Sequence, residues 1–249
     1  MHLVRRISSV IGLFSAKGGV GKTVLAVNLA TSLGKLLKGR VALMEVGGAI
    51  PTLHLYFDLP EPKIPPSKIV TGGGRIEEVI TKYGNILDIV SLSFDYGSES
   101  EIGMIIDLLR ERYPLIILDS PPGLGMEVHS SLRACTEIII VCQPEIPSVL
   151  QALQTCKIAE KWRVPIERVI INRVQGGNFE ISPTDLRKTF GGAVISIVPE
   201  DPRMPESVTK GKPLVILDPA SPAAQEINRI ARSIATKIKK NMKLLYAVK

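Results

Sequence analysis

A glycine-rich segment carries the residues best suited to chemistry in this chain. The segment reads Ser15-Ala16-Lys17-Gly18-Gly19-Val20-Gly21-Lys22-Thr23. Because glycine adopts backbone conformations that other residues avoid, such a loop can curl until its N–H groups point inward at an anion. A helix that begins at the end of the loop adds the positive end of its dipole at the same place. We therefore predict a phosphate-binding loop.

Side chains of the same segment would complete a nucleotide site. Lys22 would reach the β- and γ-phosphates, and the Thr23 hydroxyl would bind Mg²⁺. The alternative is a plain glycine turn, which the flanking runs disfavour because a strand at 9–14 and a helix from 24 are what such a loop needs. The loop residues expected to bind the cofactor, ATP or ADP, are Lys17, Gly18, Gly19, Val20, Gly21, Lys22, Thr23 and Val24.

Asp119 is the second candidate for metal chemistry. It ends the apolar run Leu115-Ile116-Ile117-Leu118. Ligands of doubly wound sheets bind at the carboxyl ends of the strands, so Asp119 would hold the Mg²⁺ water shell opposite Thr23. An apolar strand that ends in aspartate is a weak signal alone, but the phosphate-binding loop upstream makes it a strong one.

Strand and helix patterns alternate along the chain. They predict an α/β fold, a single doubly wound, mostly parallel sheet with helices on both faces. A serine followed by proline predicts helix starts at Ser182-Pro183 and Ser221-Pro222. A helix is expected at 101–112, and further strands are expected at 40–46, 86–92, 137–141, 168–172 and 193–198.

Composition bounds the class of protein. A chain of 249 residues with 45% hydrophobic residues fits one large domain. No apolar run is long enough to span a membrane, and the N-terminus runs directly into the first strand, so we expect no signal peptide and a cytoplasmic protein. The three cysteines form no CxxC pair, which indicates buried free thiols in a reducing compartment.

The net charge of +7 comes from the end of the chain. Residues 229–249 contain seven basic residues and no acidic one, whereas the remaining 24 basic residues balance the 24 acidic ones. We therefore divide the chain into a nucleotide-binding domain at 1–228 and a basic amphipathic helix or tail at 229–249. The tail would bind an anionic membrane surface, bind DNA non-specifically, or only pack on the domain.

The glycine-rich segment resembles the deviant Walker motif of the MinD/ParA family of P-loop ATPases. That resemblance implies a SIMIBI-type P-loop fold, catalytic roles for Lys17 and Asp119, and an ATP-bound homodimer in which Lys17 reaches the partner's nucleotide. It also implies a regulatory protein partner, which the sequence does not identify. By the same resemblance, the cofactor's base would lie near Asn172, Arg173, Pro199 and Glu200.

One departure from the family pattern concerns hydrolysis. Where the family has Asp-x-Asp, whose second aspartate orients the attacking water, this chain has Glu45-Val46-Gly47. Glu45 cannot replace that aspartate, because alternate strand residues lie about 6.6 Å apart. The resemblance thus implies an ATP-dependent dimer that positions division, chromosome or surface-appendage machinery, peripherally at a membrane if the tail binds there. Gly47 favours slow hydrolysis or a non-hydrolysing, nucleotide-sensing adaptor.

A third hypothesis is an iron–sulfur carrier of the related Mrp group. The segment from Asp119 to Gly123 suggests it, because an aspartate followed by Pro-Pro-Gly resembles the corresponding segment of that group. The missing CxxC pair and Met126, which stands where a cluster cysteine would be expected, speak against it.

Overall fold

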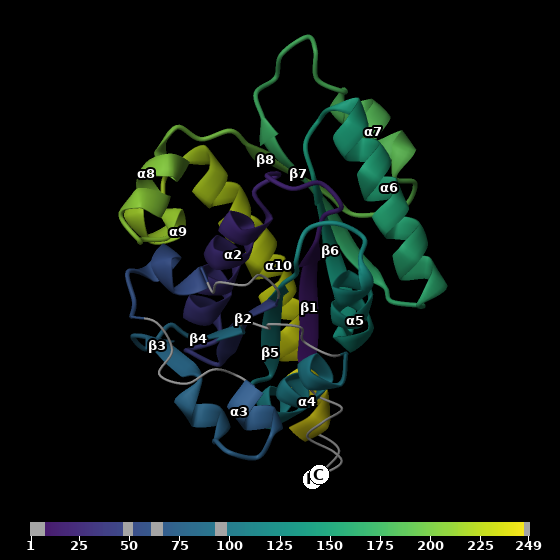
Figure 1. The fold of residues 1–249 in the computed structure, drawn as a ribbon. Coiled ribbons are helices and arrows are strands. Elements are labelled where there is room, and N and C mark those ends of the chain that lie inside the picture. Colours follow the sequence, from purple (N-terminus) through teal and green to yellow (C-terminus); the bar gives the residue numbers. More distant parts are fainter. Residues whose placement is uncertain (1–7, 47–51, 61–66, 93–98, 247–249) are drawn as a thin grey trace.

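The computed structural model describes residues 8–46, 52–60, 67–92 and 99–246. Within these ranges a single eight-stranded sheet has the order β3-β4-β2-β5-β1-β6-β7-β8 (Figure 1). The strands pair in parallel except for β3, which runs antiparallel to β4 at the edge. The strands are β1 (Ser9–Phe14), β2 (Val41–Val46), β3 (Ile80–Tyr83), β4 (Leu87–Leu92), β5 (Leu115–Asp119), β6 (Glu137–Cys142), β7 (Ile166–Val174) and β8 (Ile195–Pro199).

Helices cover both faces of the sheet. One hydrophobic cluster joins the sheet to α2, α9 and α10, and a second joins the opposite face to α3, α4, α5, α6 and α7. The central strands β2, β5 and β6 are buried along their whole length, as expected for parallel strands covered on both sides. This arrangement confirms the predicted doubly wound α/β fold.

The two helix starts predicted at serine–proline pairs are those of α7 and α10, whereas α4 begins at Glu99, two residues before its predicted start. Ser182 caps α7 by accepting a hydrogen bond from the Asp185 N–H at 3.1 Å. The helices are α2 (Lys22–Leu36), α3 (Ser67–Val70), α4 (Glu99–Arg110), α5 (Met126–Ala134), α6 (Ile146–Lys161), α7 (Pro183–Thr189), α8 (Arg203–Thr209), α9 (Leu214–Leu217) and α10 (Pro222–Tyr246), with 3₁₀ turns η1 (Leu53–Phe57) and η2 (Ile76–Glu78).

The basic C-terminal segment is part of α10, which crosses residues 228 and 229 without a break. Its apolar residues from Ile227 to Ile238 are buried, and the helix packs along α2. Two contacts also fasten α10 to the amino ends of strands. Lys237 pairs with Glu137 of β6, and Arg168 of β7 donates to the Ser233 hydroxyl at 3.2 Å.

The cysteines are free thiols in this structure. Cys135 and Cys142 are buried, while Cys156 is only partly covered. Burial raises the pKa of the Cys135 and Cys142 thiols to about 12 and that of Cys156 to about 11, so all three are protonated at neutral pH. Among the described helices, none is long and apolar enough to cross a bilayer.

Candidate functional site

The phosphate-binding loop joins the end of β1 to the start of α2. Two of its glycines take the left-handed conformation, Gly19 with φ of 75° and Gly21 with φ of 89°. At Gly21 space is restricted as well, because a Cβ atom there would collide with the side-chain amide of Asn172. That amide donates a hydrogen bond to the Val20 carbonyl at 2.8 Å. The tip of the loop therefore requires glycine at this position, and the hydrogen bond from Asn172 of β7 holds it in place.

Lys22 and Asp119 meet below the loop. Their side chains are 9% and 4% exposed, and Lys22 Nζ lies 3.0 Å from Asp119 Oδ1. Lys22 also donates to the Ser120 carbonyl oxygen. A buried ammonium is costly unless it is paired and hydrogen-bonded, and these partners compensate it. The structure thus brings together the two charged residues that sequence analysis selected from segments 97 residues apart.

A cavity of about 430 Å³ opens over the loop. Every residue that sequence analysis assigned to cofactor binding lines it, whereas Asp119 lies behind Lys22. The base-side residues come from the carboxyl ends of β7 and β8, as expected for a doubly wound sheet. Further lining residues, which were not among the predicted cofactor-binding residues, are Leu25, Tyr56, Pro122, Asp201, Met204, Pro205 and Val208.

An irregular strand end shapes the side of the cavity near β7 and β8. The pairing of these strands shifts between Ile171 and Val174, and Arg173 has a φ of 60°. Arg173 Nε donates to Glu200 Oε2 at 2.8 Å, a hydrogen bond that raises the pKa of the guanidinium. The pair is half-exposed, so it forms a polar rim rather than a buried contact.

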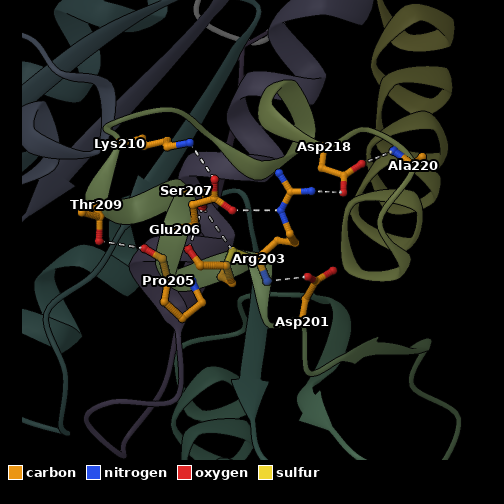
Figure 2. Close-up of polar contacts among 10 residues, drawn as sticks. Asp201, Arg203, Pro205, Glu206, Ser207, Thr209, Lys210, Asp218 and Ala220 are labelled. Atoms are coloured by element: carbon orange, nitrogen blue, oxygen red, sulfur yellow. Dashed lines mark hydrogen bonds and ion pairs between the residues drawn. The ribbon is translucent and has the colours of Figure 1, made fainter.

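Helix α8 contributes an apolar part of the wall through Met204, Pro205 and Val208. Figure 2 shows how Arg203 holds this helix. Its guanidinium donates to Glu206 at 3.0 Å and to Asp218 at 3.1 Å, and its N–H donates to Asp201 at 3.0 Å. These hydrogen bonds join α8 to the chain segments before and after it, and so fix the position of the apolar wall.

Lys17 is paired within its own chain. Its ammonium contacts the carboxylate of Glu145, the residue that precedes α6. The two side chains are 35% and 46% exposed, so the pair lies at the surface beside the cavity. Three apolar side chains of the neighbouring helices in the chain are also exposed: Met126 at the start of α5, and Ile146 and Leu150 on α6, which begins after Glu145.

Glu45 has a structural role. Its buried carboxylate accepts hydrogen bonds from the Thr52 N–H at 3.1 Å, the Thr52 hydroxyl at 2.8 Å and the Leu53 N–H at 3.0 Å. These bonds occupy the carboxylate and fix the start of η1. Gly47, on which the expectation of slow hydrolysis rests, lies outside the described residues.

The donor set fits Mg²⁺ held together with phosphate. Thr23 and Asp119 offer a hydroxyl and a carboxylate, which are hard oxygen ligands. Among the described residues no group of three or more His, Cys, Asp or Glu side chains could hold a metal by itself. Mg²⁺ usually takes one or two protein ligands, with waters and substrate phosphates completing its shell. Thr23 and Asp119 would hold the ion, which would neutralise phosphate charge.

A glycine loop between a parallel strand and a helix, with a buried lysine and aspartate below it, defines a P-loop nucleotide-binding protein. Residues 11–214 match the CobQ/CobB/MinD/ParA nucleotide binding domain. The chain belongs to this family, as the resemblance of its loop to the MinD/ParA motif predicted.

Individual relatives cover nearly the whole chain. An uncharacterized ATP-binding protein of Methanocaldococcus jannaschii is 30% identical over 237 residues, 93% of this chain and 89% of the relative. MinD in a MinC:MinD cell division complex of Aquifex aeolicus has a TM-score of 0.82 and 26% identity, over 91% of this chain and 96% of that one. A Pyrococcus horikoshii MinD complexed with Mg-ADP shares the fold, with a TM-score of 0.83, 24% identity, and coverage of 91% and 96%.

Proposed function

We propose that this protein binds ATP and ADP with Mg²⁺ in the cavity over the phosphate-binding loop and works as an ATP-dependent dimer. The observation that carries the proposal is that the loop and Lys22 line one cavity, with the Asp119 carboxylate 3.0 Å from the Lys22 ammonium. Relatives support the choice of nucleotide, because one is named an ATP-binding protein and a solved neighbour contains Mg-ADP.

Lys22 changes partners when nucleotide binds. In this structure its ammonium contacts Asp119 and Ser120. The oxygens of phosphates bound in the loop accept strong charge-assisted hydrogen bonds from the Lys22 ammonium. Lys22 therefore turns to the β- and γ-phosphates. Thr23 and Asp119 would then hold Mg²⁺ and its water shell. The base lies between Asn172, Arg173, Pro199 and Glu200.

Dimerisation in this proposal uses Lys17. Its contact with Glu145 keeps the ammonium on its own subunit, and the pair is exposed enough to exchange partners. When ATP is bound, Lys17 leaves Glu145 and reaches the phosphates of the partner's nucleotide. The exposed apolar side chains of Met126 and Ile146 then contribute to the contact between subunits.

Hydrolysis is slow in this proposal, because Gly47 provides no carboxylate to aim water and Glu45 is bound to Thr52 and Leu53. Loss of such a group costs ~10²–10⁴-fold in rate. The second candidate function, a nucleotide-sensing adaptor that does not hydrolyse ATP, is favoured by the same glycine. The dimer positions cellular machinery through an unidentified regulatory protein, and the iron–sulfur hypothesis gains no support because no CxxC pair is present.

The division at 228 and 229 also remains a proposal. The fully buried side chains of α10 end at Ile238 and Met242 still packs against the core, so a surface-binding piece would use the exposed side chains of residues 239–249. Its three clustered lysines Lys239, Lys240 and Lys243 suit an anionic membrane or DNA. The protein would then be cytoplasmic and peripheral at that surface.

Sedimentation velocity of the wild type and Lys17→Ala with Mg-ADP and with Mg-ATP tests the dimer. We expect the wild type to dimerise with ATP and not with ADP. Lys17→Ala should still bind nucleotide and remain monomeric. Normal ATP-dependent dimerisation of Lys17→Ala would contradict the role given to this lysine, and phosphate release in the same samples separates a slow ATPase from an adaptor.

A further inference from the structure

Tyr56 lines the nucleotide cavity, and the function proposed above gives its hydroxyl no role. The residue belongs to η1, the 3₁₀ turn that follows β2 in the chain. Its side chain is partly buried and packs against the hydrophobic cluster on the α2 face of the sheet. Because this packing holds the ring of Tyr56 in place, it also fixes the position of the hydroxyl.

The strand order places Tyr56 on the Asp119 side of the cavity. Glu45 of β2 lies directly beside Asp119 of β5 in the parallel register. Asn172 lies two residues before the end of β7, and Pro199 ends β8. Strands β1 and β6 separate β7 from β5. The carboxyl ends of parallel strands line one edge of the sheet in the same order as the strands. An element that follows β2 thus reaches the cavity beside Asp119 and Lys22.

Hydrogen bonds hold η1 in this place. The Glu45 carboxylate accepts from the N–H groups of Thr52 and Leu53, at the start of the turn. At the other end, the ring of Phe57 packs on Tyr83 with 4.8 Å between ring centroids. Breaking a buried carboxylate's hydrogen bonds is costly, so η1 is a fixed support rather than a loose loop.

The Tyr56 hydroxyl is a donor in a negatively charged neighbourhood. Burial, followed by the negative charges of Asp119 and Glu45, raises the pKa of this phenol, so it stays protonated at neutral pH. Within the ranges that the structure describes, no hydrogen bond joins the hydroxyl to the protein. A protonated phenol beside two carboxylates can donate to an anion that enters with its own cation, as a magnesium-bound phosphate does.

We propose that Tyr56 is a positioning residue whose hydroxyl donates a hydrogen bond to the terminal phosphate of a bound nucleoside triphosphate. The inference rests on the function proposed above. A diphosphate ends one phosphate short of the donor, so the tyrosine strengthens the binding of the triphosphate over that of the diphosphate. The cavity would then distinguish a triphosphate from a diphosphate through Tyr56. This residue reaches it from the segment after β2, the strand that ends without the family's Asp-x-Asp.

Calorimetric titration of Mg-ADP and of Mg-AMP-PNP, a slowly hydrolysed ATP analogue, into wild type, Tyr56→Phe and Tyr83→Phe tests the proposal. Tyr83→Phe is the matched control, because its phenol contacts the same turn but does not line the cavity. We expect Tyr56→Phe to weaken the binding of AMP-PNP by ~10- to 150-fold, the range for a hydrogen bond to a charged group, and to leave the binding of ADP unchanged. Tyr83→Phe should change neither.

The outcomes separate this inference from the function beneath it. Equal losses for ADP and AMP-PNP in Tyr56→Phe would mean that the hydroxyl contacts a part common to both nucleotides, and unchanged AMP-PNP affinity would mean that the hydroxyl makes no contact with the terminal phosphate. Either result overturns the role of Tyr56 while leaving nucleotide binding intact. Failure of the wild type to bind either nucleotide would instead refute the proposed function, and this inference with it.

Discussion

The pair between Lys17 and Glu145 predicts that the monomer resists dimerisation by a measurable amount. If Lys17 must leave Glu145 to reach a partner's nucleotide, then Glu145→Gln removes a contact that exists only in the monomer. The side chains are 35% and 46% exposed, and pairs of this kind contribute about 0.2–1 kcal/mol. Two protomers each lose one contact, so the ATP-dependent dimer should tighten by about 2- to 30-fold.

Sedimentation equilibrium of wild type and Glu145→Gln with Mg-AMP-PNP measures this change. Glu77→Gln is the matched control, since it breaks an ion pair with Arg112 of similar exposure, between η2 and the segment after α4. The effect should shrink at high salt, because the pair is exposed to solvent. An unchanged or weaker dimer in Glu145→Gln at low salt would refute the reasoning that this contact holds Lys17 back.

Four further predictions concern three single residues and the C-terminal segment. Gly21→Ala should weaken Mg-ATP binding in calorimetry, because its left-handed backbone costs about 1–2 kcal/mol and its Cβ displaces Asn172; unchanged affinity would contradict this. Gly47→Asp should raise phosphate release by ~10²-fold or more without tightening ATP, whereas brisk release by the wild type would show that another group aims the water. Burial raises the pKa of Cys142 to about 12, above its ordinary value of 9.0, so its contribution to stability is present up to pH 9 and is lost as pH rises toward 12. A thiol reagent at pH 8 should accordingly modify it only after unfolding in urea, and rapid native labelling would count against its burial. Deleting 239–249 should lower the melting temperature only slightly, through the loss of the partly buried Met242, and abolish co-sedimentation with anionic liposomes or DNA; retained co-sedimentation excludes the tail.

The fold and the loop could be predicted because both depend on local sequence. Buried parallel strands are continuous apolar runs, so β1 and β5 were recognised with their observed bounds. The short edge strand β3 was missed, since Ile80 to Tyr83 is half-exposed and has no apolar run. Helix α6 was missed because its start, after Glu145, follows a proline-containing segment that resembles a loop.

The rest of the site could not be predicted because it depends on contacts between distant residues. The partner of Lys17 lies 128 residues away, and no local pattern connects it with Glu145. Tyr56, Met204 and Val208 look like ordinary core residues in the sequence, yet they line the cavity because η1 and α8 reach it from different strands. Long-range packing, rather than any motif, decides which apolar residues a ligand would meet.

Titration of Mg-ATP into the purified, nucleotide-free wild type and Lys22→Ala tests the central claim most directly. Lys22→Ala leaves Asp119 buried without its cation, so circular dichroism must first show that the variant is folded. We predict saturable one-to-one binding in the micromolar range for the wild type, as loop amides and lysine together provide. Lys22→Ala should show no measurable binding. A wild type that does not bind Mg-ATP, or a folded Lys22→Ala that binds it equally well, would contradict the account.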